Sequence, residues 1–398
     1  MDGSDSAEGV AKMVAASGAV ATCTDEIDAV IADVARSPLS FREPGSVLAG
    51  IRPADLLAQV VAAMLDRTHL RPGDITRVLV GGGPAYADIA RLACEIAGVK
   101  VRVEAPDTTR GSLQAVIHEG VRAAGPRDVV LVLGVTGEGG VDAAARSTRR
   151  GVKAELVAAT WSMEPEILDA YARRSRQRAR DVALAGEFAN EIVPAVKWDE
   201  TCQVVTADET VLRPSVPSDG APLFYDPEFA EKYPSIGWHL NSGNVSQPAS
   251  GAAAAILVRA GESARLGLRP RARILGIAEN PHRAGSPNCG PVEAARSLLI
   301  QSGLQADDLD HYEVAESYAP IPVLWRREFN ADPERFNPRG GSIGLGHVGP
   351  ADGLRSLATA LSALELTGGR LGILASEGFG SAGDAMIIER IPRLTSIV

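Results

Sequence analysis

The stretch from Asn337 to His347 reads NPRGGSIGLGH and is the most informative part of this 398-residue chain. Its four glycines predict a turn, because glycine adopts backbone conformations that other residues avoid. The turn lies between an apolar segment and a helical pattern, and it ends in His347, where an imidazole can be directed into a pocket. His347 is therefore a candidate oxyanion donor or general base, the alternative being a histidine that caps a helix or packs in the core.

Further motifs lie on both sides of this turn. Glu313–Ala319 (EVAESYA) precedes it and Gly378–Glu389 (GFGSAGDAMIIE) follows it. Earlier in the chain, Asn244–Ala255 (NVSQPASGAAAA) ends in a run of alanines, and Gly290-Pro291 opens a helical pattern. Three shorter stretches belong to the same series of motifs, at 34–38 (VARSP), 91–93 (RLA) and 111–115 (GSLQA). Together these motifs form an ordered series over most of the chain.

Apolar, strand-like runs alternate with amphipathic helical patterns, which predicts an α/β fold. In the first part of the chain the predicted strands are 28–34, 77–80 and 129–133, and the predicted helices are 55–65 and 112–124.

The same order of elements recurs later in the chain. Helix 55–65, helix 113–124 and strand 130–133 resemble three later elements, namely helix 292–299, helix 354–364 and strand 372–375. The offset is about 240 residues in each case, which indicates duplication of a domain rather than a short repeat. The sequence thus predicts two related α/β halves.

A segment of different character separates the halves. Its helical pattern, Glu164–Gly186, carries five arginines: Arg173, Arg174, Arg176, Arg178 and Arg180. They form either a solvated face paired with nearby acids or a site for a phosphate or nucleotide tail, because the arginine fork suits phosphate. The predicted division is a flexible N-terminal extension at 1–24, a first half at 25–150 plus 241–270, the inserted segment 151–240, and a second half at 271–398.

Composition excludes several classes of protein. Hydrophobic residues make up 45% and charged residues 23% of the chain, which excludes disorder over most of its length. The net charge of −10 gives no overall attraction to nucleic acid or to an anionic membrane, and no apolar run approaches the ~20 residues of a membrane span. Four scattered cysteines argue against a disulfide framework or a zinc site. We expect a cytoplasmic protein with no metal, nucleic-acid or membrane partner.

The ordered motifs resemble those of the thiolase family over nearly everything from residue 26 onward. The resemblance implies a thiolase-like fold: a duplicated five-layer αβαβα core with an excursion (loop) domain at 151–240. It also implies a coenzyme A or acyl-carrier thioester as substrate, with the adenine nucleotide against the excursion domain and no separate cofactor. A homodimer or tetramer is implied as well, with a small partner subunit as a further option.

Thiolases use two catalytic cysteines, and the resemblance implies that both are replaced in this chain. Thr109 stands where the family has its nucleophile, either as a nucleophile itself or as the N-cap of the next helix. The second cysteine falls at Ala375 or Ser376 when counted from the strand, and at Glu377 when counted back from the end of the following strand. In an apolar site, Glu377 would be a carboxyl of raised pKa suited to acid–base work. The catalytic histidine is retained as His347.

The resemblance also implies a set of substrate-binding residues. Tyr318, which follows Ser317, stands where the family places an aromatic ring beside the pantetheine arm, with packing as its alternative role. Ser246 matches a serine that contacts the pantetheine. Cys289 lies in a loop that resembles one lining the pocket, either as a small buried residue or as a displaced nucleophile. Ala315 replaces the asparagine that holds a water in the oxyanion hole.

Two functions fit these residues. The first is a thiolase-like enzyme that acts on a CoA or carrier-protein thioester without the usual cysteine nucleophile, by acyl transfer, condensation or carbon–carbon cleavage. The retained His347 favours it. The second is a non-catalytic thiolase-fold subunit that binds an acyl-CoA or a partner protein, which the replaced cysteines favour. Thiolase activity through Cys289 is a third alternative.

Overall fold

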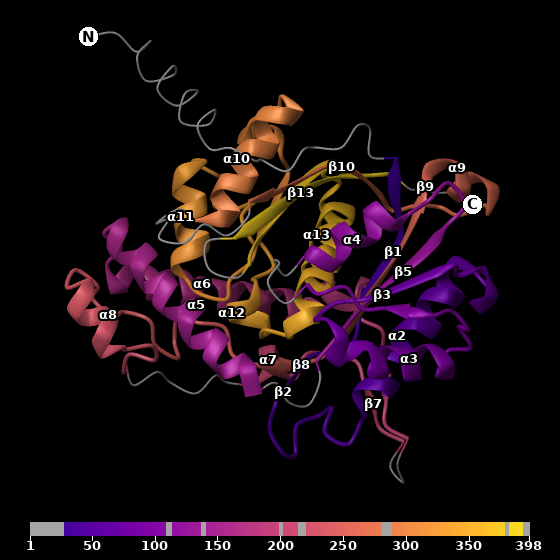
Figure 1. Cartoon of the computed structure of the whole chain (residues 1–398), viewed down its shortest axis with the longest axis horizontal. Helices are drawn as coiled ribbons and strands as arrows, with labels where there is room; N and C mark the ends of the chain where they lie inside the picture. Colours follow the sequence, from indigo (N-terminus) through magenta and orange to yellow (C-terminus); the bar gives the residue numbers. More distant parts are fainter. Residues whose placement is uncertain are drawn as a thin grey trace.

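The computed structural model describes residues 28–108, 114–136, 141–198, 202–213, 220–280, 289–378 and 382–392, and for 141–148 the backbone alone. The extension predicted at 1–24 lies outside these residues. Figure 1 shows two α/β halves, the first in indigo and purple and the second in orange and yellow.

The first half is built of short strands alternating with helices. Its elements before the inserted segment are β1 (Ala29–Arg36), β2 (Ser40–Phe41), α2 (Pro53–Thr68), β3 (Arg77–Val80), α3 (Ala87–Ile96), β4 (Val103–Glu104), α4 (Ala115–Ala123) and β5 (Val129–Val135). After the inserted segment it is completed by β8 (Ala249–Ser250), β9 (Ala252–Arg259) and α9 (Ala260–Arg265). The strands and helices predicted for this half are present, within a few residues at their ends.

The second half repeats the order of the first. Its elements are β10 (Ala272–Asn280), α10 (Gly290–Ser302), β11 (His311–Val314), α11 (Pro320–Glu328), α12 (Ser342–Leu345), α13 (Asp352–Thr367), β12 (Leu371–Glu377) and β13 (Gly383–Arg390). The helices α10 and α13 and the strand β12 occupy the positions at which the sequence predicts copies of α2, α4 and β5.

The strands form one nine-stranded mixed sheet in the order β11-β12-β13-β10-β1-β9-β5-β3-β4. Strand β3 pairs in parallel with β4 and β5, and β11 pairs in parallel with β12, whereas the other pairs are antiparallel. The two halves join where β1 meets β10, over the partners Val30–Arg273 and Ile31–Ala272 alone. Because β3, β5, β9 and β1 correspond to β11, β12, β13 and β10, the two half-sheets have the same strand order.

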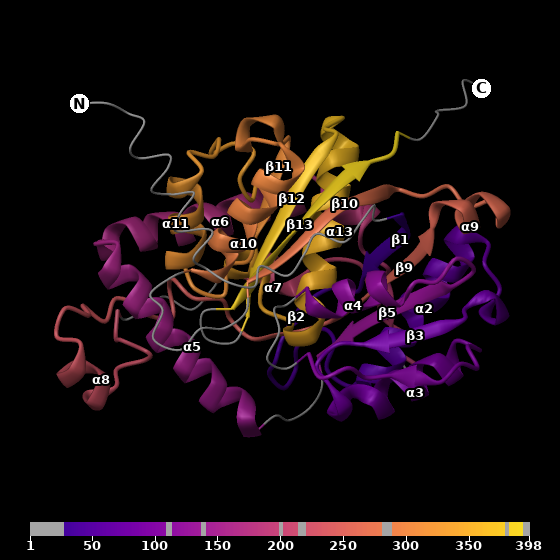
Figure 2. The same cartoon turned by 45° about the horizontal axis from the view of Figure 1, so that its top comes forward.

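Helices cover both faces of each half-sheet, which gives five layers. Helices α4 and α13 lie in the middle and pack on the inner faces of both half-sheets, through residues such as Ile31, Val132, Leu374 and Met386. Helices α2 and α3 cover the outer face of the first half-sheet, while α10 and α11 cover that of the second. Figure 2 shows the two groups of strands on either side of α4 and α13. This is the five-layer thiolase fold that the sequence predicts.

Local sequence explains where the outer helix α2 begins and ends. Pro53 occupies its first turn, where a missing N–H costs nothing, and His69 ends it in the left-handed conformation. Leu57, Val61 and Met64 recur at helical spacing and are fully buried against the sheet. The continuous apolar run of β5 is typical of a strand buried on both faces.

The inserted segment contains α5 (Val141–Thr160), α6 (Pro165–Leu184), β6 (Ala195–Val196), β7 (Val204–Val205), α7 (Glu209–Leu212) and α8 (Pro227–Lys232). Helix α6 is the arginine-rich helix that the sequence predicts. Helix α5 runs without a break across the predicted boundary at 150/151, so that boundary falls inside a helix. The described part of the chain has no helix that is both long enough and apolar enough to cross a bilayer.

Candidate functional site

His347 lies in a turn that is hydrogen-bonded to a segment of the first half. Helix α12 ends at Gly346, whose φ of 94° lies in a region that favours glycine. The backbone N–H of His347 donates to the carbonyl oxygen of Gln247 (2.8 Å), and its own carbonyl oxygen accepts from the N–H of Ala249 (2.9 Å). The imidazole remains 27% exposed. The predicted glycine-rich turn is therefore present, with its histidine at a partly open surface.

The residues that follow His347 pack against the end of β5. A Cβ atom at Gly134 would lie 2.6 Å from the Cα of Ala351, so glycine is needed for this close approach. The hydroxyl of Thr136 donates to the carbonyl oxygen of Val348 (3.2 Å). Both halves of the molecule thus hold the turn that carries the histidine.

The imidazole contacts a buried carboxylate, that of Asp352. Nδ1 of His347 lies 3.0 Å from Oδ2 of Asp352. The same carboxylate accepts from the hydroxyl of Ser342 (2.9 Å) and from Nε of Arg355 (3.0 Å). Burial alone would raise the pKa of Asp352, but the charges of Arg355 and His347 outweigh it and hold that pKa well below its usual range. Asp352 is therefore an ionised partner of His347.

The segment that pairs with His347 also reaches the predicted substrate-binding residues. Ser246 donates its backbone N–H to the carbonyl oxygen of Ser317 (3.0 Å). Val245 and Tyr318 form a single β-bridge, and the buried Tyr318 ring meets Phe224 edge-on, with their centroids 5.6 Å apart. The structure thus brings Ser246, Ser317 and Tyr318 together next to the segment 247–249, which pairs with His347.

Glu377 ends β12 and is buried, with 6% of its surface exposed. Within the described part of the chain, neither of its carboxyl oxygens has a hydrogen-bond partner of standard geometry. Burial raises the pKa of Glu377, and the neighbouring Ser317 hydroxyl and the positive charges of Arg150 and His347 offset part of that rise. The carboxyl of Glu377 and the imidazole of His347 are therefore electrostatic neighbours.

Cys289 is a second buried group near Glu377. It precedes the first residue of α10, and burial raises the pKa of its thiol to about 12, an effect that the charge of Glu377 increases and that of Lys153 opposes. A position at the start of a helix favours a thiolate, but burial dominates here. Cys289 is thus a neutral thiol at physiological pH.

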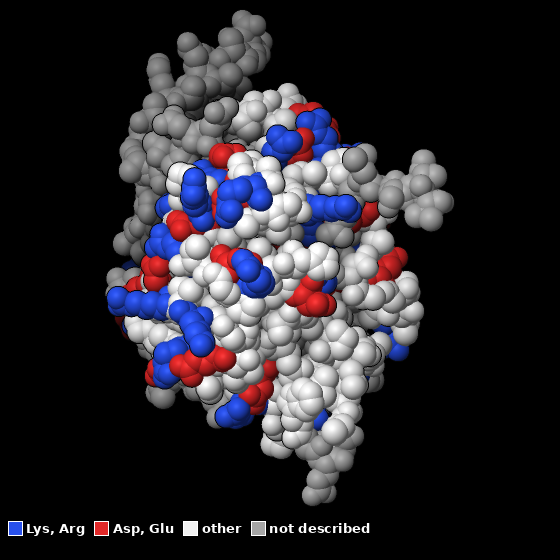
Figure 3. Space-filling view, turned by 90° about the vertical axis from the view of Figure 1, so that its right-hand side faces the viewer, with Lys and Arg blue, Asp and Glu red and all other residues white. Residues whose placement is uncertain are grey.

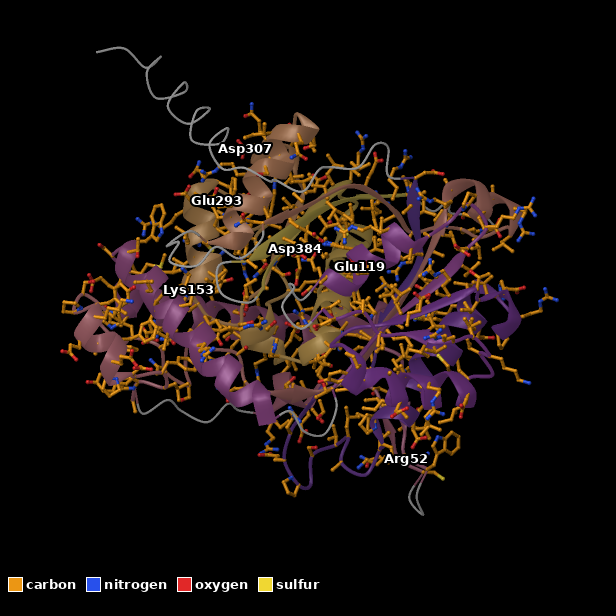
Figure 4. The ribbon with its side chains drawn as sticks, viewed as in Figure 1. Arg52, Glu119, Lys153, Glu293, Asp307 and Asp384 are labelled. Carbon is orange, nitrogen blue, oxygen red and sulfur yellow. The ribbon has the colours of Figure 1, made fainter. Side chains whose placement is uncertain are left out.

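Ser376 points away from this group. Because neighbouring residues on a strand face opposite sides, Ser376 lies on the other face of β12 from Glu377. Its hydroxyl donates to Oδ1 of Asp384 (2.7 Å), and Oδ2 of Asp384 lies 3.4 Å from Nδ1 of the buried His118. Figure 4 shows Asp384 near the centre of the molecule, with Glu119 on α4 close to it in this view. The structure does not bring Ser376 to the same face as Glu377.

Thr109 lies outside the described residues, so its predicted role stays a prediction. Sequence reasoning missed Asp352, Arg150 and Lys153, which interact with His347, Glu377 and Cys289 respectively. For Asp352 there was a signal: an acidic residue opens the helix that follows the histidine turn. Arg150 and Lys153 lie on α5, where composition alone does not separate them from solvated charges.

A cavity of about 430 Å³ adjoins the histidine turn. Gly346 and Gln247 line it, so it borders the backbone that positions His347. Its other lining residues include four arginines: Arg173, Arg176 and Arg180 of α6, and Arg213 just after α7. Burial lowers the pKa of Arg176. The cavity is therefore rich in positive charge close to the candidate catalytic group.

The arginines of α6 divide between two faces of the helix. Arg174 and Arg178 form ion pairs with Glu334 (2.6 and 3.1 Å), as expected of a solvated face. Arg173 and Arg180 line the cavity and have no carboxylate partner within the described residues. The ion-paired interpretation therefore holds for Arg174 and Arg178, whereas a phosphate site at the cavity face stays a prediction.

Known proteins match this chain along most of its length. Residues 132–261 match the thiolase N-terminal domain and residues 268–390 match the thiolase C-terminal domain. A steroid 3-ketoacyl-CoA thiolase from Mycobacterium tuberculosis is 32% identical over 426 aligned positions, which cover 97% of this chain and 99% of the relative.

Two other relatives have different substrates in their names. A β-ketoadipyl-CoA thiolase from Pseudomonas putida is 30% identical, with 92% of this chain and 100% of the relative covered. An acetyl-CoA acetyltransferase from Chromobacterium violaceum is 28% identical, with 90% and 99% covered. The shared fold and these full-length matches establish that the chain belongs to the thiolase family.

Proposed function

We propose that this protein is an enzyme that acts on a CoA or carrier-protein thioester without the usual cysteine nucleophile, by acyl transfer, condensation or carbon–carbon cleavage. The observation that carries the proposal is a buried carboxyl, Glu377, that has no hydrogen-bond partner of standard geometry in the described residues and feels the charge of His347, whose turn borders an arginine-lined cavity. The names of the relatives, all thiolases or acetyltransferases of acyl-CoA substrates, support the substrate class.

The arginines supply a reason for a CoA ester to bind here. Arg173 and Arg180 point into the cavity without a carboxylate partner in the described residues, and the guanidinium group binds phosphate oxygens through paired hydrogen bonds. A nucleotide held there would leave its pantetheine arm to run along Gln247 and Ser246 towards His347. Gln247 both lines the cavity and accepts a hydrogen bond from the backbone N–H of His347 (2.8 Å), so it links the two.

The chemistry that these groups support is proton transfer next to a thioester carbonyl. Glu377, in its ionised form, takes a proton from C2 of the acyl group, and the resulting enolate carries its charge on the carbonyl oxygen. The imidazole of His347 stabilises that oxygen, and the proton on Glu377 then returns to carbon or to a leaving group. The raised pKa of Glu377 suits this role, since a base works best with a pKa near the operating pH.

Cys289 does not supply the nucleophile in this proposal. Its pKa of about 12 leaves almost no thiolate at neutral pH. We therefore expect negligible thiolysis of acetoacetyl-CoA. Robust thiolysis that Cys289→Ala abolishes would overturn the proposal in favour of a cysteine-dependent thiolase.

The direct test is exchange of the C2 hydrogen of saturated acyl-CoA esters in deuterated water, followed by mass spectrometry. We expect at least one ester that binds to exchange, and Glu377→Gln to slow that exchange by about 10²–10⁴-fold, the usual contribution of a general base. Esters that bind tightly but never exchange would refute the enzyme and support a binding subunit.

One observation favours that second candidate, a non-catalytic subunit that binds an acyl-CoA or a partner protein. Ala315 is buried, its backbone N–H donates to the carbonyl oxygen of Ala375 (2.9 Å), and its methyl group offers no hydrogen bond to a water. A binding subunit would keep its affinity for acyl-CoA in His347→Ala and show no exchange in either form.

A further inference from the structure

The carboxylate of Asp352 is held in one orientation by its surroundings. It is fully buried, and each of its oxygens has a hydrogen-bond donor besides the imidazole: Nε of Arg355 on Oδ1 (3.0 Å) and the hydroxyl of Ser342 on Oδ2 (2.9 Å). Arg355 itself is anchored, since its Nη2 also donates to Ser342 (3.2 Å) and to Ser356 (2.7 Å). The carboxylate therefore cannot turn away from the histidine without breaking several buried hydrogen bonds.

An ionised carboxylate accepts hydrogen bonds and donates none. Nδ1 of His347 lies 3.0 Å from Oδ2 of Asp352, so the contact is favourable only when Nδ1 carries a hydrogen. In a neutral imidazole one nitrogen is protonated and the other is not. We propose that Asp352 is a positioning residue, one that fixes the proton of His347 on Nδ1 and leaves Nε2 to face the substrate.

The catalytic consequence rests on the proposed function. With Nδ1 protonated, Nε2 of the neutral ring is an acceptor and can serve as a base. It can donate to an enolate oxygen only after the ring has taken a second proton, and the adjacent charge of Asp352 stabilises that imidazolium. His347 would thus act as a base when neutral and as an oxyanion donor when charged, rather than as a neutral donor.

The charges around the pair come from four elements. Asp352 and Arg355 lie on α13, Glu313 on β11 is 3.7 Å from Nη1 of Arg355, and Glu377 on β12 interacts electrostatically with His347, Asp352 and Arg150 of α5. Arg355 neutralises Asp352 in part, and Glu313 in turn offsets Arg355. The electrostatic environment of the imidazole is therefore set by this whole group and not by Asp352 alone.

The test is the tautomer of His347, read by nitrogen NMR of protein labelled with ¹⁵N-histidine, with His347→Gln used to assign the signals. We expect the neutral ring to carry its hydrogen on Nδ1 in the wild type. In Asp352→Asn the amide oxygen must turn to Arg355, so the amide NH₂ faces Nδ1 and the hydrogen moves to Nε2. A wild-type signal with the hydrogen on Nε2 would overturn the proposal, and this result does not need Asp352→Asn to fold.

Kinetics provide the second readout. Asp352→Asn should lower the rate of C2 exchange by about 10²–10⁴-fold, as expected when an imidazole is held in the wrong tautomer, and leave the KM unchanged. Asp33→Asn is the matched control, because Asp33 is also a buried carboxylate paired with a buried arginine, Arg271 (2.9 Å), but on β1. Equal rate losses in the two variants would reduce Asp352 to a structural role.

The two proposals fail in different ways. A hydrogen on Nδ1 together with an absence of exchange in the wild type would refute the proposed function and leave the positioning by Asp352 intact. Exchange in the wild type with the hydrogen on Nε2 would support the proposed function and refute the positioning by Asp352.

Discussion

At Glu377, the fold keeps a carboxyl group out of water and supplies no hydrogen-bond donor of standard geometry from the described residues. Such a group is more stable protonated, so its pKa is raised in the folded state. It then contributes stability at low pH that is lost as the pH rises through the folded pKa. Glutamine resembles the neutral acid, so its effect on stability must depend on pH.

We predict that Glu377→Gln increases the free energy of unfolding at pH 8 by roughly 1–3 kcal/mol, because glutamine removes the cost of burying an ionised carboxylate, and changes it little at pH 4, where the carboxyl is neutral. Urea denaturation at the two pH values measures this. Glu279→Gln is the control of opposite sign, because a hydrogen bond to His118 and then one to Arg122 lower the pKa of Glu279 to about 2 despite partial burial. That variant should lose stability at pH 8 and approach the wild type as the pH falls. A gain in Glu377→Gln that is the same at both pH values would contradict the raised pKa.

At His347, the proposed function predicts a loss of rate with little loss of binding. A donor to a developing oxyanion contributes ~3–4 kcal/mol, so His347→Ala should slow C2 exchange by about 10²–10³-fold. Isothermal titration with the same acyl-CoA should give nearly the wild-type affinity, because the cavity is lined by Gly346 and Gln247 rather than by the imidazole. A large loss of affinity with an unchanged rate per bound ester would assign His347 to binding.

The residues of this site differ in how well the sequence predicts them. The glycines before His347 predict its turn, because few residues other than glycine adopt the φ of 94° found at Gly346. The choice between Ser376 and Glu377 could not be made in the same way. It depends on which face of β12 meets the neighbouring helix, and that follows from the antiparallel register in which Ser376 lies opposite Asp384. The local sequence pattern does not determine the register in which two strands pair.

Among the elements, α6 shows how one helix serves two purposes. Residues three, four and seven positions apart share a helix face, so Arg173, Arg176 and Arg180 lie together along the cavity. Arg174 and Arg178 lie on the neighbouring face and pair with Glu334. The two faces provide a test and its control on the same helix.

We predict that Arg180→Ala weakens the binding of CoA by about 10- to 150-fold, since a hydrogen bond between charged groups contributes ~1.5–3 kcal/mol. Arg174→Ala, which removes an arginine paired with Glu334, should leave the affinity unchanged. Isothermal titration with CoA at fixed ionic strength measures both. Equal losses in the two variants would indicate a general charge effect rather than a phosphate site in the cavity.

Element boundaries were predictable only where side chains repeat at a clear period. Helix α2 shows such a period, and its predicted core is the observed one. Helix α5 does not: the buried positions among its described side chains include Glu155, whose carboxylate accepts from the backbone N–H groups of His239 (2.9 Å) and Leu240 (2.7 Å). Glu155 is a buried acid that accepts hydrogen bonds from the backbone of a distant loop, and it interrupts the apolar pattern of the helix. The sequence therefore placed a domain boundary inside this helix.

In the whole molecule, the two edges of the nine-stranded sheet differ. At one edge the residues of β11 are buried, and the segment beyond α11 covers them: the N–H of Tyr312 donates to the carbonyl oxygen of Arg335 (3.0 Å) and the N–H of Asn337 donates to that of Tyr312 (2.9 Å). At the other edge, β4 has two half-buried residues and pairs with β3 alone in the described part of the chain. An open sheet edge is a place where another chain can pair.

The open edge, together with membership of the thiolase family, leads us to predict a two-fold dimer that pairs through the first half. Figure 3 shows the side of the molecule formed largely by that half, where charges of both signs are interspersed with uncharged surface. In a two-fold dimer the same residues of both subunits meet near the axis. Uncharged residues can pack there, whereas like charges would repel each other. Light scattering at micromolar concentration should therefore give twice the chain mass of 41.5 kDa.

Val103→Lys tests which surface forms this dimer. It places a lysine on the β4 edge in both subunits, so we expect the measured mass to fall towards that of one chain. Leu366→Lys is the matched control, because Leu366 is an exposed apolar residue near the end of α13, away from that strand. It should remain dimeric. A wild-type monomer would refute the dimer itself, whereas a dimer that persists in Val103→Lys would move the interface away from the sheet edge.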